Sequence, residues 1–439
     1  MILTPIYDIK YPVIMGYTLD IRGSQMDKNA VATAKVSFLA IIISWVFYLF
    51  SYFSRVEPCV LVDNLMQDFS LNASQVGTII STLYISYGIM QIPWGIIIDK
   101  LGCRLVIFTT CVICSLGVLL FGVATASWHL VVARLLIGFS SATAYLACGK
   151  IISEMLPTNK YALFMGFTMF VGGIGGVLGS SATAGLVNAF GWRQLTCVMA
   201  IIGIAISVLT FIFLPKQTVK QTNEKGRTLE GLKLLVTNPS CWLIGLFGCM
   251  ANLPVVAVAE LWGTPFMQIR FGVSNSLASI CSAVIFIGCG IGSILAAKVA
   301  EKLNSNKKTI ILFSIGLILS FLTAVYSDTI GFWTGIALFG LCSIFAGAGT
   351  LAFDMTYKYV PSNFAGTSTG YTNMFVMGGG VIFQPLLGYL LDFLRNGKVN
   401  PDGSPMYDVV MYRCAFLCAI VFIIISVIGM FFVKEKKSV

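Results

Sequence analysis

The feature that most constrains this chain is a series of apolar stretches, each about 20 residues long, that recurs from residue 36 to residue 433. A helix needs about 20 apolar residues to cross the hydrocarbon core of a bilayer. Soluble domains carry roughly 25% charged residues, whereas this chain has 10% charged and 57% hydrophobic residues, so a soluble fold is excluded. The stretches predict twelve transmembrane helices, at Val36–Pro58, Gln75–Ile98, Leu105–Val123, Trp128–Met155, Tyr161–Phe190, Gln194–Leu214, Cys241–Met267, Asn275–Ala297, Thr309–Tyr326, Phe332–Tyr357, Thr367–Leu391 and Val409–Val433.

One long polar break, from Lys216 to Asn238, separates the first six predicted spans from the last six. The two sets repeat one another: Gly166-Phe167-Thr168 and Gly370-Tyr371-Thr372 lie as far apart along the chain as Pro157 and Pro361 do. Repeated halves around a central site are the usual plan of transporters. We therefore expect an all-α membrane protein of two pseudo-symmetric six-helix bundles, with an N-terminal tail at 1–35, bundles at 36–215 and 241–433, a central loop at 216–240 and a C-terminal tail at 434–439.

The basic residues lie mainly in alternate gaps between the spans. The chain has 28 Lys and Arg against 18 Asp and Glu, a formal net charge of +10. In a soluble protein this excess would suggest a nucleic-acid partner, but in short gaps between spans it marks the cytoplasmic side. Most lysines follow the second, fourth, sixth, eighth and twelfth spans. We expect both termini and the central loop to be cytoplasmic, the bilayer to be the main partner, and no nucleic acid to bind.

A short motif lies between the second and third spans, Gly95-Ile96-Ile97-Ile98-Asp99-Lys100-Leu101-Gly102-Cys103-Arg104. Gly95 permits close helix packing, Gly102 allows a tight turn, and Asp99 can pair with Arg104 or cap the N-terminus of a neighbouring helix. The motif resembles the G-x-x-x-D-[RK]-x-G-x-[RK] signature of the major facilitator superfamily, in the loop where that family carries it. The resemblance implies the twelve-helix fold of that family and a transport function.

Further segments resemble more specific patterns. Leu130 to Gly138, with Arg134, is similar to the family's R-x-x-x-G element, and we expect Arg134 to have a structural or gating role with the second span. Four segments resemble the phagosomal-transporter branch of intracellular bacteria: Phe47 to Arg55, Gln91 to Gly95, Gly191 to Arg193 and Gly378 to Pro385. That resemblance implies a bacterial inner-membrane protein that imports amino acids or nucleosides. The fifth span has Gly172-Gly173 where the family's antiporter element has Gly-Pro, which favours symport or uniport.

Ionisable side chains inside the predicted spans are the main functional candidates, because an intramembrane charge costs several kcal/mol unless it is paired or hydrated. The clearest are Arg55, Glu57, Arg134, Lys150, Glu260 and Asp354. They fall on the first, fourth, seventh and tenth spans, which line the central cavity in the superfamily fold. Arg55 and Glu260 lie at equal depth in the outer third of their spans, and Lys150 and Asp354 occupy repeat-equivalent positions in the inner third.

These depths predict an outer pair, Arg55 with Glu260, and an inner pair, Lys150 with Asp354. The pairs could act as gates that break alternately, or as grips on a zwitterion whose carboxylate is held by Arg55 and whose ammonium is held by an acidic residue. The alternative for all four is that their side chains snorkel to the membrane surface. Glu57 directly precedes Pro58, and we expect it at the water interface.

Aromatic and amide side chains add a predicted lining. Tyr48 and Tyr52 share a helical face with Arg55, and the second span carries a similar row. The alternative is that such rows serve packing only. The predicted substrate-binding residues are Arg55, Tyr52, Tyr48, Glu260, Tyr84, Gln91 and Asn373, and the predicted coupling or gating residues are Glu260, Asp354, Lys150, Arg134, Asp99 and Arg104.

Catalytic and metal-binding signatures are missing. Gly149-Lys150 lacks the pattern of a phosphate loop, and Cys111 and Cys114 have CxxC spacing without a second CxxC or a nearby His. We therefore expect no enzyme activity and no cofactor, apart from a proton as coupling ion at Glu260 or Asp354, with Glu260 preferred. The predicted function is proton-coupled import of a small polar metabolite, an amino acid, by a monomer. The alternatives are a carrier of a nucleoside, organic acid or siderophore in either direction, and a sensor that keeps the fold without transporting.

Overall fold

The structure is a computed structural model that describes residues 28–156, 158–215, 225–361, 364–399 and 405–435. These residues form helices, with one isolated bridge between Val399 and Pro405. The elements before the central break are α1 Lys28–Val56, η1 Glu57–Val60, α2 Val62–Phe69, α3 Ala73–Leu101, α4 Cys103–Gly122, α5 Ser127–Met155, α6 Thr158–Val177, η2 Leu178–Ala182, α7 Thr183–Phe190 and α8 Trp192–Phe213. Those after it are α9 Lys225–Val236, α10 Pro239–Ala251, η3 Pro254–Trp262, α11 Gly263–Phe271, α12 Asn275–Ala278, α13 Ile280–Leu303, α14 Asn306–Tyr326, α15 Phe332–Ala346, η4 Gly347–Thr350, α16 Leu351–Tyr357, α17 Ala365–Arg395 and α18 Val409–Phe431.

Among the described residues, 11 helical segments are long and apolar enough to cross a membrane. The predicted second span, now α3, is 29 residues long but is not one of them. Its middle carries the polar side chains of Tyr84, Tyr87 and Gln91, which lower its hydropathy. The chain is therefore a multi-pass helical membrane protein, and the count of twelve spans stays a prediction.

Several boundaries differ from the prediction. α1 begins at Lys28 instead of Val36, so it takes in part of the predicted N-terminal tail, and residues 1–27 of that tail lie outside the described residues. The predicted central loop contains the helix α9, and residues 216–224 before it are not described. Residues 436–439 of the predicted C-terminal tail also lie outside the description. Apolar stretches predict the spans, and α9 lies in a polar segment, so this helix was not predicted.

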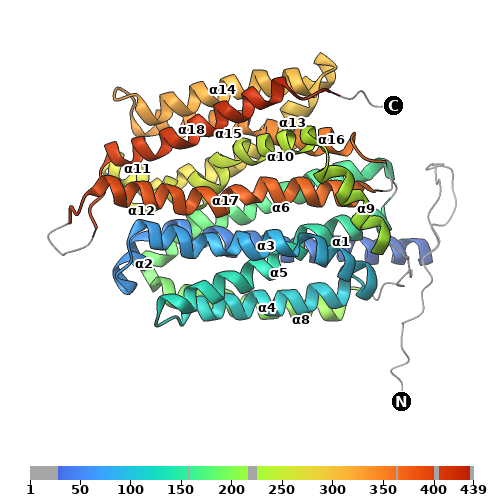
Figure 1. Ribbon diagram of the computed structural model, residues 1–439. Helices are drawn as coiled ribbons and strands as arrows, with labels where there is room; N and C mark the ends of the chain where they lie inside the picture. Colours follow the sequence, from blue (N-terminus) through green and yellow to red (C-terminus); the bar gives the residue numbers. More distant parts are fainter. Residues whose placement is uncertain (1–27, 157, 216–224, 362–363, 400–404, 436–439) are drawn as a thin grey trace.

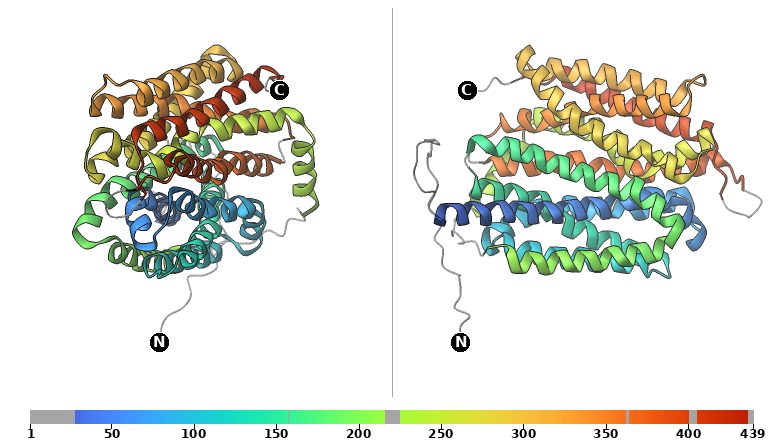
Figure 2. Two further views of the ribbon diagram at one scale, coloured as in Figure 1. Left: turned by 60° about the vertical axis from the view of Figure 1, so that its left-hand side comes forward. Right: turned by 180° about the vertical axis from the view of Figure 1, so that it is seen from behind.

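The helices form two groups that meet along their length. In Figure 1 α1, α3, α4, α5 and α8 lie below α10 to α18, α6 lies at the height of α17, and α3 and α17 run side by side where the groups touch. The view from behind in Figure 2 shows the second line of contact, between α6 and α13. We call the group α1 to α8 the first half and the group α10 to α18 the second half. A site between the halves can therefore draw side chains from α1, α3, η3, α13 and α17.

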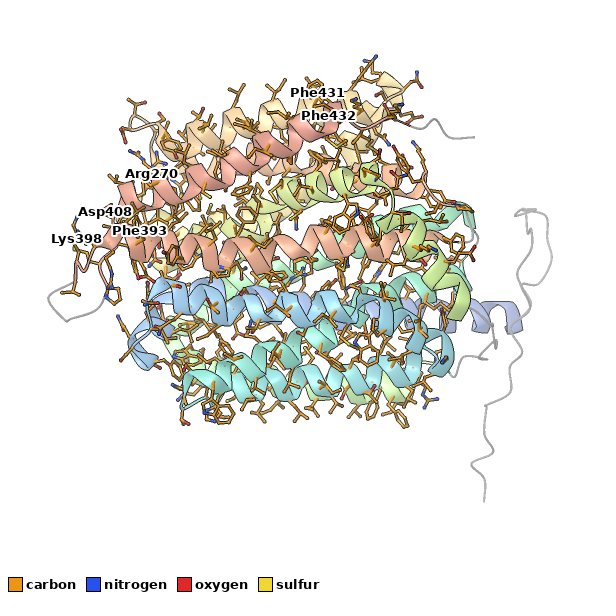
Figure 3. The ribbon with its side chains drawn as sticks, in the orientation of Figure 1. Arg270, Phe393, Lys398, Asp408, Phe431 and Phe432 are labelled. Carbon is orange, nitrogen blue, oxygen red and sulfur yellow. The ribbon has the colours of Figure 1, made fainter. Side chains whose placement is uncertain are left out.

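The two ends of the molecule are named after the predicted orientation. The inner end holds Leu101, Met155 and Phe431, and the outer end holds Ala73 and Arg270. Figure 3 shows Phe431 and Phe432 at the inner end, opposite Arg270, Lys398 and Asp408 at the outer end. Many large apolar side chains are exposed along the sides of the helices, where the lipid would lie.

Candidate functional site

Arg55 and Glu260 lie together where the two halves meet. Arg55 stands in the last turn of α1, Glu260 lies in η3, and Arg55 Nε is 3.5 Å from Glu260 Oε1 with side chains only 5% and 1% exposed. The predicted pairing is thus present in the structure. Arg55 Nη1 also donates to the Met377 sulfur at 3.5 Å, a weak acceptor.

This ion pair leaves most of its hydrogen-bonding capacity unused. Among the described residues, Nε and Nη2 of Arg55 and both carboxylate oxygens of Glu260 have no hydrogen-bond partner. The charges are close enough to attract each other, but their geometry is not that of a hydrogen bond. Because buried polar groups in proteins are normally hydrogen-bonded, the pair can accept a further polar group that brings both donors and acceptors.

Aromatic rings enclose the pair on the side of α1. The Arg55 guanidinium lies over the Tyr52 ring, 3.7 Å from its centroid. The Tyr52 ring meets the rings of Tyr48 and Phe286 edge-on, at centroid distances of 5.7 and 5.8 Å. Tyr145 of α5 lies 5.9 Å from Tyr48. Stacking on an aromatic face holds the guanidinium plane in one orientation, which suits bidentate recognition of a carboxylate.

The interface of α3 and α17 adds polar groups. Asn373 Nδ2 donates to the Tyr87 hydroxyl at 3.3 Å, and Tyr87 lies close enough to Arg55 to interact with its charge. Tyr84 and Gln91 are buried on the same helix as Tyr87, and the Tyr84 hydroxyl and both amide atoms of Gln91 have no hydrogen-bond partner among the described residues. Tyr84 and Tyr87 thus lie between the halves, since the Tyr84 ring packs against Gly380 and Tyr87 bonds to Asn373 of α17.

Glu260 is carried by an irregular segment. Residues 254–262 of η3 form a π-helix, a rare conformation that is frequent at functional sites. Gln384 of α17 holds this segment on both sides of Glu260: its Nε2 donates to Val256 O at 2.7 Å, and its backbone oxygen accepts from Trp262 Nε1 at 3.0 Å. Apart from Pro254 at its start, no residue pattern in this segment predicts the helix distortion.

Arg134 is buried inside the first half and is fully engaged. Its Nη1 donates to Ser54 O at 2.9 Å, its Nη2 to Arg55 O at 3.1 Å and its Nε to Ile80 O at 3.4 Å. In a continuous α-helix Ser54 O would accept from the N–H of residue 58, which is a proline and has none. Arg134 thus completes the end of α1 and ties it to α3.

The prediction that Glu57 lies at the water interface is wrong. Glu57 is only 3% exposed, and its Oε1 accepts a hydrogen bond from Thr196 Oγ1 of α8 at 2.6 Å. The four residues of η1, Glu57–Val60, are all buried, and η1 packs against η3 and α11 of the second half instead of leading into solvent. Glu57 therefore belongs to the interior of the first half.

The predicted inner pair of Lys150 with Asp354 is also wrong in this structure. Lys150 Nζ lies 2.7 Å from Asp99 Oδ1 and 3.6 Å from Glu154 Oε1, so both partners come from its own half. Asp99 is consequently not paired with Arg104, whose guanidinium instead lies over the ring of Phe211.

Asp354 finds its partners within the second half. Its Oδ2 lies 2.7 Å from Lys358 Nζ and accepts a hydrogen bond from Asn306 Nδ2 at 2.5 Å. Lys150 is thus paired mainly with Asp99 of α3, and Asp354 with Lys358 one helical turn away, while both side chains are partly exposed. The inner ends of the halves are therefore not joined by these charges, whereas the outer ends are joined by Arg55 and Glu260.

Sequence reasoning missed several members of the site. Met377 lies one turn after Asn373, so the helical spacing that selected Asn373 could have found it. Tyr145 and Phe286 lie in spans with many apolar residues, and their type alone gives no signal. Among the residues that the structure describes, no group of three or more His, Cys, Asp or Glu side chains is placed to hold a metal ion.

Comparisons with known proteins identify the family of this fold. The model of the Major Facilitator Superfamily matches residues 36–385. The chain is 24% identical over 361 residues to a hexuronate transporter of Bacillus subtilis, covering 78% of this chain and 85% of the relative. It is 22% identical to the membrane sensor protein UhpC of Escherichia coli, covering 79% and 84% of the two chains.

A solved structure has a similar fold. It is that of a bacterial homolog to the human lysosomal transporter Spinster, in an inward-facing and unoccupied conformation, with a TM-score of 0.76 and 16% identity. The match covers 91% of this chain and 97% of that one. The likeness therefore extends over both halves.

Proposed function

Because the chain belongs to the major facilitator superfamily, we propose that it is a secondary active transporter that moves a small carboxylate-bearing metabolite across the membrane by alternating access. The observation that carries the proposal is the Arg55–Glu260 pair, which is buried between the halves with unused donors and acceptors. Arginine presents parallel N–H groups that match the two oxygens of a carboxylate. A substrate held there would contact both halves at once, as alternating access requires.

The proposed architecture is two six-helix bundles, at 36–215 and 241–433, in which α3 is the second span and brings the total from 11 to twelve. α3 is 29 residues long, which at about 1.5 Å per residue exceeds a hydrocarbon core of about 30 Å. It packs along α17, so protein covers much of its polar face. We further propose a monomer in the bacterial inner membrane, with both tails and the central loop in the cytoplasm.

Two substrate classes fit the pair. An amino acid would place its carboxylate on Arg55 and its ammonium on Glu260, whose oxygens have no hydrogen-bond partner among the described residues. An organic acid would use Arg55 alone, and the hexuronate named for the Bacillus relative is such a carboxylate without an ammonium group. Tyr48, Tyr52 and the polar residues of α3 and α17 would contact the rest of either molecule.

We also propose import coupled to a proton at Glu260. When a substrate carboxylate binds Arg55, Glu260 loses the positive charge that favours its ionised form. Glu260 can then take up a proton. Import would follow the membrane proton gradient. Asp99, Arg104, Lys150 and Asp354 would then act at the inner end as gating residues, and Arg134 would hold the end of α1 in place.

The test is a thermal-stability screen of the purified protein against amino acids, hexuronates, other organic acids, nucleosides and iron chelates, since a ligand that binds the native state stabilises it. We expect stabilisation by carboxylates and its loss in Arg55→Gln. Loss of the effect in Glu260→Gln would select an amino acid, whereas its retention would select an organic acid. Stabilisation only by uncharged nucleosides would contradict the proposal.

A second candidate, favoured by the similarity to a membrane sensor protein, is a receptor that binds the metabolite without moving it. Uptake into proteoliposomes separates the two. A transporter accumulates the stabilising compound when a proton gradient is imposed, and a sensor binds the compound without accumulation.

A further inference from the structure

The first turn of α3 lies at the outer end, against the end of α17. A helix begins with backbone N–H groups that have no acceptor in the helix. The N-cap residue Asn72 satisfies one of them. Two others are satisfied from the second half: Ser74 N donates to Asp392 Oδ2 at 2.8 Å, and Ala73 N donates to the Tyr407 hydroxyl at 2.9 Å. The start of α3 is thus completed by side chains of the opposite half.

Asp392 and Tyr407 also bind each other. The Tyr407 hydroxyl donates to Asp392 Oδ1 at 2.6 Å. Burial raises the pKa of Tyr407, so its hydroxyl stays protonated and available as a donor at physiological pH. A carboxylate at the N-terminus of a helix is favourable because the helix end carries a partial positive charge. The start of α3, the Asp392 carboxylate and the Tyr407 hydroxyl are therefore each hydrogen-bonded to the other two.

The backbones beneath this arrangement are in direct contact. A Cβ atom added at Gly388 would lie 2.3 Å from Ala73 O, and one added at Gly77 would lie 2.5 Å from Gln384 O. Only glycine permits such close approach at these two positions. The outer ends of α3 and α17 are therefore closed on each other without intervening side chains, in contrast to Lys150 and Asp354 at the inner end.

We propose that Asp392 and Tyr407 form a latch that holds the outer end closed in this conformation and opens each time Arg55 is exposed to the outside. The proposal rests on the alternating-access cycle proposed above. Opening the outer end would break the two hydrogen bonds that Ser74 N and Ala73 N donate to Asp392 and Tyr407, and would leave these groups to water. The latch therefore favours the conformation seen here over the outward-facing one.

The same loop offers a matched control. Asp408 Oδ1 accepts a hydrogen bond from Met411 N at 3.0 Å, so Asp408 caps α18, which belongs to its own half. Figure 3 shows Asp408 and Lys398 beside each other at the outer end, and their charged atoms lie 3.8 Å apart. Asp392 and Asp408 thus have the same chemistry at a helix start, but only Asp392 connects the halves.

A native cysteine reports the opening. Cys59 in η1 is 1% exposed at the outer end, where its thiol lies against Thr264 and Ser282 of the second half. We would add a membrane-impermeant charged maleimide to the full-length protein in proteoliposomes and measure modification of Cys59 by peptide mass spectrometry. Cys114, buried inside the first half, serves as the internal reporter of unfolding. The assay needs no substrate.

We expect Asp392→Ala and Tyr407→Phe to raise the Cys59 modification rate about tenfold, the change expected when a hydrogen bond to a charged group is lost. Asp408→Ala should stay within about twofold of the unmodified chain. Modification of Cys114 in Asp392→Ala would show that this variant unfolds. The Tyr407→Phe result then tests the latch, because that substitution removes only one hydroxyl. Equal rates for Asp392→Ala and Asp408→Ala, or no change in Tyr407→Phe, would overturn the latch.

Gly388→Ala separates failure of the latch from failure of the transport cycle. Its added Cβ atom cannot fit against Ala73 O, so it forces the outer ends apart whatever the charges do. Faster Cys59 modification in Gly388→Ala, with none in Asp392→Ala and Tyr407→Phe, would overturn the latch and leave alternating access standing. Protection of Cys59 in all three variants would contradict both.

Discussion

Two buried arginines, Arg134 inside the first half and Arg55 between the halves, have opposite surroundings. Three nitrogens of Arg134 donate to backbone carbonyls, so its region is complete in the folded chain. Arg55 faces Glu260 and an aromatic ring, and two of its nitrogens have no hydrogen-bond partner among the described residues. This difference is the basis for our proposals that Arg134 holds the end of α1 in place and that Arg55 binds the substrate.

The largest expected effect is on stability, from Arg134→Ala. The substitution leaves the carbonyls of Ser54, Arg55 and Ile80 buried without this donor, which should lower the free energy of unfolding by about 3–5 kcal/mol. Thermal unfolding in detergent measures it. The matched control is Arg55→Gln combined with Glu260→Gln, which removes both partners of a buried pair and should be nearly neutral. Equal destabilisation of the two variants would erase the distinction between the regions.

The same double variant should have the largest effect on ligand binding. Removing Arg55 and Glu260 together takes away the charged groups between the halves, and we expect affinity for the stabilising carboxylate to fall at least tenfold, about 1.4 kcal/mol. Calorimetric titration gives the value. Unchanged affinity would show that the carboxylate binds at a site other than the Arg55–Glu260 pair.

Glu260→Gln alone sharpens the role of the carboxylate. We expect binding of an organic acid to remain within about threefold, because Arg55 keeps its charge. Accumulation driven by a proton gradient should disappear, since Gln cannot take up a proton. Binding and uptake are measured on the same preparation in proteoliposomes. Uptake that still follows the proton gradient would exclude Glu260 as the coupling residue.

The smallest effect concerns an ion pair outside both regions, in which the exposed Asp328 contacts the partly buried Arg413. The hydrogen bond from Arg413, together with its charge, lowers the pKa of Asp328 below the usual carboxyl range. A lowered pKa in the folded state means that the pair adds stability above the ordinary pKa of Asp, about 3.9, and loses it as the pH falls through the folded value.

Melting temperatures of the unmodified chain and of Asp328→Asn should therefore differ slightly at neutral pH and converge in acid below about pH 4. The exposure of Asp328 keeps this effect small, because solvent screens surface pairs. A gap that stayed constant down to the most acidic sample would show that the ion pair is not its cause.

The sequence predicted Arg55 with Glu260 because ionisable residues stand out in apolar spans and their depths could be matched. It failed for Lys150 and Asp354, since equal depth says nothing about competing partners one turn away, such as Glu154 and Lys358.

Other features depend on geometry that the sequence does not show. The acceptors of Arg134 follow from Pro58, a signal that could have been used. The π-helical form of η3 and its contacts with Gln384 arise from packing between distant segments, so no local pattern reveals them.

The most direct test of the central claim compares two ligands on two proteins. The carboxylate that stabilises the protein most, and its carboxamide, would be titrated calorimetrically into the unmodified chain and into the Arg55→Gln, Glu260→Gln variant. We predict that the unmodified chain binds the carboxylate at least tenfold more tightly than the carboxamide and that the variant binds both alike. Equal affinity of the unmodified chain for the two ligands would contradict the claim that Arg55 is reserved for a substrate carboxylate.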